Sequence, residues 1–531
     1  MPGRSVMQHK FSEVPSANIQ RSVFDRSHTH RTTLDSGWLV PFFHDEVLPG
    51  DTHSCTPHIF ARMATPLHPL MENLFFDYHF FFVPYRILWD NWEKFCGAQD
   101  DPDDSIDFTV PRITSLSTGY WTGSLFDYLG LPCHVGISYN HNALACRAYN
   151  LIYKEWYRDQ NLQDSPVINT GDGPDAYGDF PLRRRGKRHD YFTACLPNPQ
   201  KGDALPLPIG LNAPVHGIGI NSGSPQSSTP LSNVRQSGEH TSQFDDWRTT
   251  SHPTLFNYIE MTGPGPNDYP NIMADLSSAT GATINSLREA ITVQRMMERD
   301  ARSGTRYPEV IKAHFGVTSP DFRVQRPEYI GGGSAPVAIT SVPQTSETGT
   351  GTPQGNLAAF GTVSASGNGF TYSATEHGCI LGICSVRADL TYSRGLHRSF
   401  SRQTRYDYYW PEFAMLGEQA VLNKELYLDT DITENEDVFG YQEAWADYRY
   451  KNSLITGEFR HTGPTPLDSW HLSIDFGATR PTLSDSFIQD TPPVDRVVAT
   501  PDEAEFIVDA YFQLQSARPL PVNSVPGLTR F

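Results

Sequence analysis

The residues of this sequence best suited to chemistry form a run of positive charge beside aromatic rings. The basic run (residues 183–188) holds five cations within six residues: Arg183, Arg184, Arg185, Lys187 and Arg188. Tyr191 and Phe192 follow closely. Because guanidinium groups pair with phosphates and rings stack on bases, this combination is typical of single-stranded nucleic-acid binding. We therefore take the five cations as a candidate DNA contact. Ion pairs with Asp190 and with a neighbouring subunit would explain the same charges without DNA.

Two other clusters have the residue types of metal sites without the full spacing. His53, Cys55 and His58 are zinc-ligand types, but no fourth ligand follows at a recognisable distance. The carboxylates of residues 100–104 offer the oxygens that calcium prefers, but they lack the glycine and terminal glutamate of an EF-hand loop. We predict solvated or core histidines in the first cluster, a solvated acidic turn in the second, and no bound metal.

No motif in the sequence indicates an enzyme. The sequence has no Walker A loop, no His-Glu-x-x-His pair, no nucleophile elbow and no paired Cys-x-x-Cys groups. A glycosidase would need two positioned carboxylates, and no pair among the many acidic residues stands out. We therefore predict a protein that is not an enzyme and needs no cofactor.

The charge balance restricts how the chain can bind nucleic acid. It has 41 Lys and Arg residues against 60 Asp and Glu residues, which gives a net charge of −19. A protein that coats nucleic acid with its whole surface is basic, so contact must come from a local patch or from a separate basic partner. We expect a small basic DNA-binding protein or polyamines to neutralise any DNA that the chain holds.

Cysteine usage and hydropathy indicate synthesis in a reducing cytoplasm. The seven cysteines are odd in number and scattered, which favours reduced, buried thiols over a disulfide framework. The first 30 residues are polar and lack the apolar stretch of a secretory signal. No run of about 18 apolar residues occurs, so we expect no membrane insertion.

Strand patterns dominate the regular parts of the sequence. Residues 74–83, 384–391, 470–476 and 505–514 interleave apolar with polar side chains, as strands with one buried face do. These segments are far apart, so distant parts of the chain must pair. The predicted fold class is mainly β: an eight-stranded antiparallel jelly-roll sandwich with long loop insertions and a few helices.

Three stretches have helical periodicity and are expected to pack on the sandwich. They are residues 88–97, residues 144–156 and residues 283–302. In the last, Ser286 and Glu289 resemble a capping box, and Gly304 marks the end of the helix.

The remaining stretches lack periodicity and define the predicted domain boundaries. Residues 1–35 are predicted to be an extended N-terminal arm ordered by its neighbours, and residues 36–531 a single jelly-roll domain. Within that domain, residues 202–246 and 331–368 are rich in Gly, Ser and Thr or Pro and are predicted to be long loops. The first is the candidate surface protrusion, and the second is a lesser candidate for the same role.

Several sequence stretches together resemble a known family. They are LDSGWLVP at 34–41, DEVLPGD at 45–51, FFVP at 81–84, WDNWEKF at 89–95, the basic run, ERDAR at 298–302, QRPEY at 325–329, VRADLTY at 386–392 and GYQEAWADYRY at 440–450. In this order they resemble the major capsid protein of gokushovirus-type microviruses, small tailless bacteriophages with circular single-stranded DNA. The resemblance covers most of the chain and fails over the two predicted loops.

The resemblance implies a jelly-roll subunit with large insertions that assembles into a T = 1 icosahedral shell of 60 copies. It implies protrusions around the threefold axes, which could attach to a receptor on the host cell, and it transfers no catalytic residue. The expected location is the virion, after synthesis in the bacterial cytoplasm. A carbohydrate-binding jelly roll or a phage attachment protein is the alternative, since the same fold serves lectins.

Overall fold

The structure of the chain is a computed structural model with two compact units. It describes residues 20–203, 284–318, 325–350 and 353–523 in full, and short strands between residues 215 and 274. Residues 202–297 form the smaller unit, and the rest of the chain forms the larger unit. The larger unit contains both main sheets.

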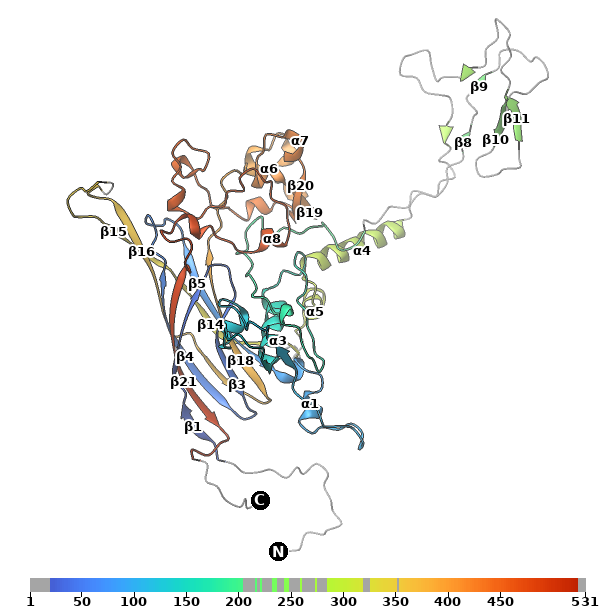
Figure 1. The fold of residues 1–531 in the computed structure, drawn as a ribbon. Coiled ribbons are helices and arrows are strands. Elements are labelled where there is room, and N and C mark those ends of the chain that lie inside the picture. The colour runs from blue at the N-terminus through green and yellow to red at the C-terminus, as the bar shows by residue number, and fades with distance from the viewer. Residues whose placement is uncertain are drawn as a thin grey trace. The chain divides into compact units, whose positions relative to one another are not determined.

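The first sheet has seven strands, and all its strand pairs are antiparallel. Its long strands lie in the order β2 (His28–Leu34), β21 (Phe506–Arg518), β4 (Thr52–Met63) and β16 (Leu357–Ser366). Three shorter strands join them: β1 (Ser22–Asp25), β15 (Ala338–Pro343) and β17 (Phe370–Ser373). The last strand of the chain thus lies between strands from its beginning, as the red and blue ribbons of Figure 1 show.

The second sheet has four strands in the order β14 (Glu328–Pro336), β5 (Leu74–Pro84), β18 (Gly378–Ala388) and β3 (Val40–Val47). Counted among the eight long strands, the first sheet holds the first, eighth, third and sixth. The second holds the fifth, fourth, seventh and second. We interpret this order as a jelly roll, to which β1, β15 and β17 are additions. The prediction of a mainly β, antiparallel fold is confirmed.

Aromatic side chains fill the space between the two sheets. Every second residue of β21 from Phe506 to Leu514 is buried, and the residues between them are exposed. The ring of Phe512 in the first sheet lies 5.3 Å from the ring of Phe42 in the second sheet. Phe42 in turn lies 5.8 Å from Phe80 of its own sheet. Because each buried aromatic contributes roughly 1.5–3 kcal/mol, this core is the main source of stability of the sandwich.

The outer face of the second sheet is covered by the insertion between β5 and β14. Helix α3 (Leu144–Ile152) continues into one π-helical turn (Tyr153–Tyr157) and shares a buried cluster with β5 and β18. Nearly all of β18 is therefore buried on both faces. The same insertion contains β6 (Arg112–Thr114), β7 (Asn140–Asn142) and α2 (Leu125–Tyr128). The helix predicted at 144–156 is confirmed.

The insertion between β18 and β21 forms a third buried cluster, to which Tyr191, Phe192 and Cys195 of the other insertion also belong. It contains the hairpin of β19 (Glu418–Leu422) and β20 (Val438–Glu443) and three one-turn helices, α6 (Asn423–Leu426), α7 (Ile432–Asn435) and α8 (Asp485–Ile488). Among the described residues, no helix has both the length and the apolar character needed to cross a membrane.

Two predicted helices differ from the structure in detail. Residues 88–97 contain only the single turn α1 (Trp92–Phe95), because the Asp90 N–H donates to the Thr170 carbonyl instead of continuing a helix. Helix α4 (Ile284–Arg302) is confirmed and ends before Gly304, whose φ is +91°. Its start lies ahead of Ser286, so the capping-box prediction is wrong. Helix α5 (Tyr307–Phe315) was not predicted.

Residues 331–368 do not form the predicted long loop, because most of β14 and all of β15 and β16 lie in this range. Composition misleads here, since Gly331, Gly332 and Gly333 lie in a strand against large neighbours. A Cβ at Gly333 would lie 2.7 Å from the Tyr78 hydroxyl oxygen, so the position has room for glycine only.

The strand predicted at residues 470–476 is also absent from the structure. Trp470 ends a 3-10 turn (Asp468–Trp470), and Ile474 makes a single bridge to Tyr392. The alternation of apolar residues here reflects packing of an irregular segment on its neighbours rather than a sheet.

The predicted N-terminal arm is extended but belongs to the sandwich where it is described. β1 and β2 pair with β21 of the same chain, so residues 22–34 are ordered by their own subunit. Residues 1–19 lie outside the described residues.

The smaller unit contains the predicted protrusion, residues 202–246. Nearly all side chains of that range lie outside the described residues. The described backbone of the smaller unit contains two two-residue ladders, β8 (Val215–His216) with β13 (Met273–Ala274) and β9 (Ile220–Asn221) with β12 (Tyr258–Ile259). It also contains a longer antiparallel pair, β10 (Ser232–Arg235) with β11 (Gln243–Trp247).

Candidate nucleic-acid interface

The basic run lies in extended conformation between two other segments of the larger unit. Arg185 donates its backbone N–H to the Gly37 carbonyl (2.7 Å) and accepts one from Asp490 (2.8 Å). Lys187 donates its backbone N–H to the Ile488 carbonyl (2.8 Å). The run therefore joins the turn before β3 to the segment that includes α8.

Each of the five cations lies over an aromatic ring of the same chain. The distances from cation to ring centroid range from 3.9 to 5.7 Å, and the pairs are Arg183 with Tyr153, Arg184 with Trp38, Arg185 with Tyr157, Lys187 with Phe487 and Arg188 with Phe75. A cation over a ring is attracted by the electron density of the ring face, by about 0.5–2 kcal/mol. Because the rings come from both insertions and from the sandwich, the run ties these parts together.

Asp77 of β5 supplies the main counter-charge. Its carboxylate accepts hydrogen bonds from Arg185 Nη1 (2.8 Å) and from Arg387 Nη2 of β18 (2.8 Å). Arg185 also donates to Ser385 Oγ (2.7 Å). The side chains of Asp77 and Arg185 are only 5% and 11% exposed. Burial acts to raise the pKa of Asp77, but the two guanidinium groups hold it below its usual value.

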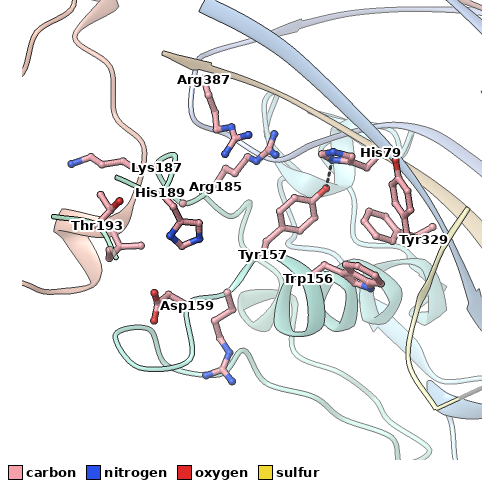
Figure 2. A pocket seen from close by; sticks show the side chains of 14 residues that line it. His79, Trp156, Tyr157, Asp159, Arg185, Lys187, His189, Thr193, Tyr329 and Arg387 are labelled. Atoms are coloured by element: carbon pink, nitrogen blue, oxygen red, sulfur yellow. Dashed lines mark hydrogen bonds between the residues drawn. The ribbon is translucent and has the colours of Figure 1, made fainter. Parts of the chain in front are cut away.

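Part of the basic run lines a pocket of about 430 Å³. The lining combines cations with rings, and Figure 2 shows the Arg185 and Arg387 guanidinium groups beside each other. The aromatic wall comes from β5, β14 and the end of α3: His79, Phe81, Tyr329, Trp156 and Tyr157. Arg158 and Lys187 add charge, and Asp159 is the carboxylate in the lining. Such a pocket offers an anion its counter-charges and a planar base its stacking surface.

Burial sets the protonation states around this pocket. It lowers the pKa of His79 to about 4, helped by Arg185, so this imidazole is neutral at pH 7 while it bonds the Tyr157 hydroxyl (2.9 Å). Burial also lowers the pKa of Lys187 to about 8, which leaves the ammonium mostly charged at pH 7. Nearby, burial raises the pKa of Asp490 to about 7, against the opposing effect of Lys187.

The structure brings only two of the five predicted contacts into the pocket lining, Arg185 and Lys187. Arg183 and Arg184 lie over rings outside that lining, and Arg188 donates to Asp389 (3.0 Å). The basic run thus forms ion pairs within its own subunit, with Asp77 and Asp389 rather than with Asp190. DNA contact by the five cations stays a prediction.

The pocket also contains residues that the sequence did not identify. Trp156 lay in a predicted helix and was assigned to packing, Tyr157 directly followed that helix, and Arg387 lay on a predicted strand. A cation on the polar side of an otherwise apolar strand can indicate a binding site, and Arg387 is such a cation. Nothing local marks His79 or Tyr329, because only the pairing of β5 with β14 brings them together.

The two clusters that were considered as metal sites have different surroundings. On β4, His53 and Cys55 face the core, whereas His58 is on the exposed side, so the three cannot share an ion. His53 instead bonds Ser516 Oγ (2.9 Å). In the acidic run, the Asp104 carboxylate accepts the N–H of Asp100 (3.2 Å), as in an exposed turn.

A further cluster of ligand types lies at His461, Asp468 and His471, whose polar atoms are within 4.8 Å of one another. The sequence did not indicate it. His461 Nδ1 bonds Asp468 Oδ1 (2.6 Å), and His471 Nδ1 accepts the Ser473 N–H (3.1 Å). With Nδ1 as acceptor, a neutral His471 carries its proton on Nε2, which leaves that nitrogen no lone pair for an ion. We interpret the trio as hydrogen-bonded and assign it no metal.

Comparison with known proteins covers the whole chain. A family model described as "Capsid protein (F protein)" matches residues 12–528. Capsid protein VP1 of Bdellovibrio phage phiMH2K is 44% identical over an alignment of 540 positions that covers 98% of each chain. Capsid protein VP1 of Chlamydia phage 1 is 43% identical over an alignment of 590 positions that covers 99% of this chain and 98% of that protein. The protein of the same name from Spiroplasma virus 4 is 36% identical over an alignment of 545 positions that covers 98% of each chain.

Proposed function

The chain belongs to the phage capsid protein (F protein) family, and we propose that 60 copies of it assemble into a T = 1 icosahedral shell around a circular single-stranded DNA genome. The observation that carries this proposal is the likeness to three capsid proteins over 98% or more of this chain. Closed point groups are the rule for identical subunits, and permanent contacts between them bury roughly 2,000–5,000 Å².

Electron microscopy of the purified full-length chain tests the assembly. We expect closed particles with icosahedral symmetry, together with the DNA content of a packaged genome when the particles come from infected cells. Particles of another symmetry, or a monomer or plain dimer with small contacts, would contradict the proposal.

We propose that the basic run and its pocket form one local contact with the genome. Support comes from the mixture of cations and rings, which suits a phosphate and a base. If all five cations met phosphates, their share of the salt dependence would be a slope of about −0.7 × 5, or roughly −3.5.

Single substitutions can separate DNA contact from a structural role of the basic run. Arg183→Gln and Arg188→Gln leave the Asp77 ion pairs intact. Arg31→Gln, at an exposed position of β2 in the first sheet, is the matched control. Normal shells with less packaged DNA than the control support contact. If the variants fail to assemble, the basic run has a structural role. If intact shells package the normal amount of DNA, the basic run does not contact the genome.

An acidic shell needs help to hold an acidic genome. At −19 per chain the average interaction with DNA is repulsive, so we propose a small, very basic partner protein or polyamines inside the shell. Mass spectrometry of purified virions should find such a partner in stoichiometric amounts. Virions that hold DNA with the coat protein and metal ions alone would contradict this.

We propose that residues 202–246 lie on the outer surface around the threefold axes and take part in host attachment. Their composition cannot build a core, and they fall in a compact unit separate from the sandwich. Limited proteolysis of intact particles should cut this range, and its deletion should block attachment while shells still form. Protection of the range inside intact shells would end the idea.

A further inference from the structure

The insertion between β18 and β21 carries a group of exposed aromatic rings. We call Tyr406, Tyr408, Tyr409, Trp410 and Tyr448 the aromatic face, and each of them is between 46% and 62% exposed. Rings of this size are rarely gathered at the surface of a protein that acts alone. An exposed set of five therefore requires an explanation.

Trp445 and the half-buried Phe413 connect several rings of the aromatic face. Tyr409 lies 5.8 Å from the ring of Trp445 and 6.4 Å from Tyr448. Tyr406 lies 6.4 Å from Phe413, which stacks on Trp445 at the same distance. The Arg402 guanidinium lies over both Tyr408 and Tyr448, and Trp410 follows Tyr409 in the chain.

Trp445 fixes the base of this surface. It is buried, and its indole Nε1 donates to the Phe413 carbonyl (3.0 Å). Its φ of +67° is in the left-handed region, which a bulky residue rarely adopts. Such a conformation persists only where the surroundings hold it, so the rings above are presented on a defined support.

Two arginines of the same segment, Arg398 and Arg402, point into the protein. The exposed Arg405 lies 5.1 Å from the centroid of the Tyr406 ring, and the exposed Arg449 pairs with Glu443. Arg402 pairs with Asp447, its side chain is 8% exposed, and its guanidinium lies 4.4 Å from the centroid of the Tyr448 ring. Arg398 donates to the Ala420 carbonyl (2.6 Å). A surface for single-stranded DNA presents its cations outward to the phosphates. This face presents mainly rings, which fits a protein partner.

We propose that the aromatic face is a contact surface for a second copy of this chain within the shell. The inference rests on the proposed assembly, which requires each copy to bury a large area against other copies. Tyr and Trp are enriched at the centres of protein interfaces, where they bury much area at little entropic cost. A polar hollow beside the face, lined by Arg402, Gln419 and Asp447, can receive polar side chains from the neighbour.

Removal of two rings from the full-length chain tests the proposal. The double variant Tyr409→Ala with Trp410→Ala leaves Trp445 in place, and Tyr177→Ala is the control, since Tyr177 is 43% exposed and far from the face in sequence. Assembly is followed by sedimentation and electron microscopy, and the fold by circular dichroism. We expect at least a tenfold loss of closed shells for the double variant, an unchanged fold, and a normal yield for Tyr177→Ala.

The outcomes distinguish this proposal from the proposed function. If the unaltered chain forms no shells, the assembly itself is refuted. If the unaltered chain assembles and the double variant assembles equally well, the aromatic face is not a subunit contact. Normal shells that package less DNA, or that fail only to attach to cells, would assign the face to another partner and also overturn the proposal.

A measurement without any substitution covers the case in which the double variant fails to fold. Hydroxyl-radical footprinting compares assembled shells with dissociated subunits of the unaltered chain. We expect Tyr406 to Trp410 to be several-fold less oxidised in shells, while Tyr177 changes little. Equal oxidation of the aromatic face in both forms would overturn the proposal.

Discussion

The basic run and the aromatic face contain the same residue types in opposite arrangements. In the basic run, five cations lie over five rings of the subunit itself, and Asp77 and Asp389 pair with Arg185 and Arg188. In the aromatic face, Arg402 is paired below the surface and the rings above it are open. Residue composition alone therefore does not decide whether a segment stabilises its own subunit or binds a partner.

The difference follows from what each segment lies against. The basic run lies between the sandwich and both insertions, so its side chains contact all three of these parts. The aromatic face lies on short 3-10 turns near Trp445, and within the described part of the chain its rings are between 46% and 62% exposed. Substitutions should therefore affect subunit stability strongly in the first region and weakly in the second.

The largest effect is expected for Asp77→Asn. The change leaves Arg185 and Arg387 buried without their counter-charge, so the free energy of unfolding should fall by about 3–5 kcal/mol. Denaturant unfolding of dissociated subunits measures it. Asp509→Asn is the control, because its pair with Arg31 is exposed and contributes about 0–1 kcal/mol. Equal effects of the two changes would contradict a structural role for the basic run.

Asp490 should give the unfolding free energy a pH dependence. Its pKa is raised to about 7 in the folded chain, so the folded state binds a proton more tightly than the unfolded state. This contribution is present at pH 4 and is lost as the pH rises to about 7. Asp490→Asn should make the fall in stability between pH 5 and pH 8 shallower, by about 2 kcal/mol. An unchanged slope would assign the pH dependence to other groups such as Glu505, whose pKa burial raises to about 7.

A smaller loss is expected for Arg188→Gln. Arg188 is partly exposed, pairs with Asp389 and lies 3.9 Å from the centroid of the Phe75 ring. Loss of both interactions should cost about 1 kcal/mol in chemical unfolding. Arg188→Lys keeps the charge and should recover about half of the loss. A loss above 3 kcal/mol would place this position with Arg185 rather than at the edge of the run.

The smallest effect on the isolated subunit is expected for Trp410→Ala. The ring is half-exposed, so the free energy of unfolding should change by less than about 1 kcal/mol. Trp445→Ala, only 7% exposed in the same region, should cost about 3–5 kcal/mol. Similar losses for both tryptophans in thermal unfolding would mean that the aromatic face belongs to the subunit core.

The sequence correctly predicted the elements in which one buried side alone accounts for the periodicity of the apolar residues. β21 alternates because one side faces the core and the other is open, and α3 repeats because one stripe packs on β18. The prediction failed at residues 331–333, where a Cβ would collide with neighbouring segments, at Gly333 with the ring of Tyr78 in the adjacent strand. No local pattern reveals that requirement, because β14 and β5 are far apart in the chain.

The candidate site was predicted in part for the same reason. Local sequence identified five cations, but their direction depends on Asp77, Tyr157 and Arg387, which come from separate segments. The pocket itself is a product of strand pairing between β5, β14 and β18. The aromatic face was not predicted, because the inward turn of Arg402 depends on Asp447, which lies beyond the hairpin of β19 and β20.

The position of β21 also has a consequence for synthesis on the ribosome. This strand, the last one in the chain, hydrogen-bonds to β4 along one edge and to β1 and β2 along the other. Until residues 506–518 emerge, the two edges it joins remain open and the facing half of the core lacks Phe506 and Phe512. A chain that terminates before residue 506 therefore cannot close its first sheet. The sandwich of a subunit is completed only after residues 506–518 have been translated.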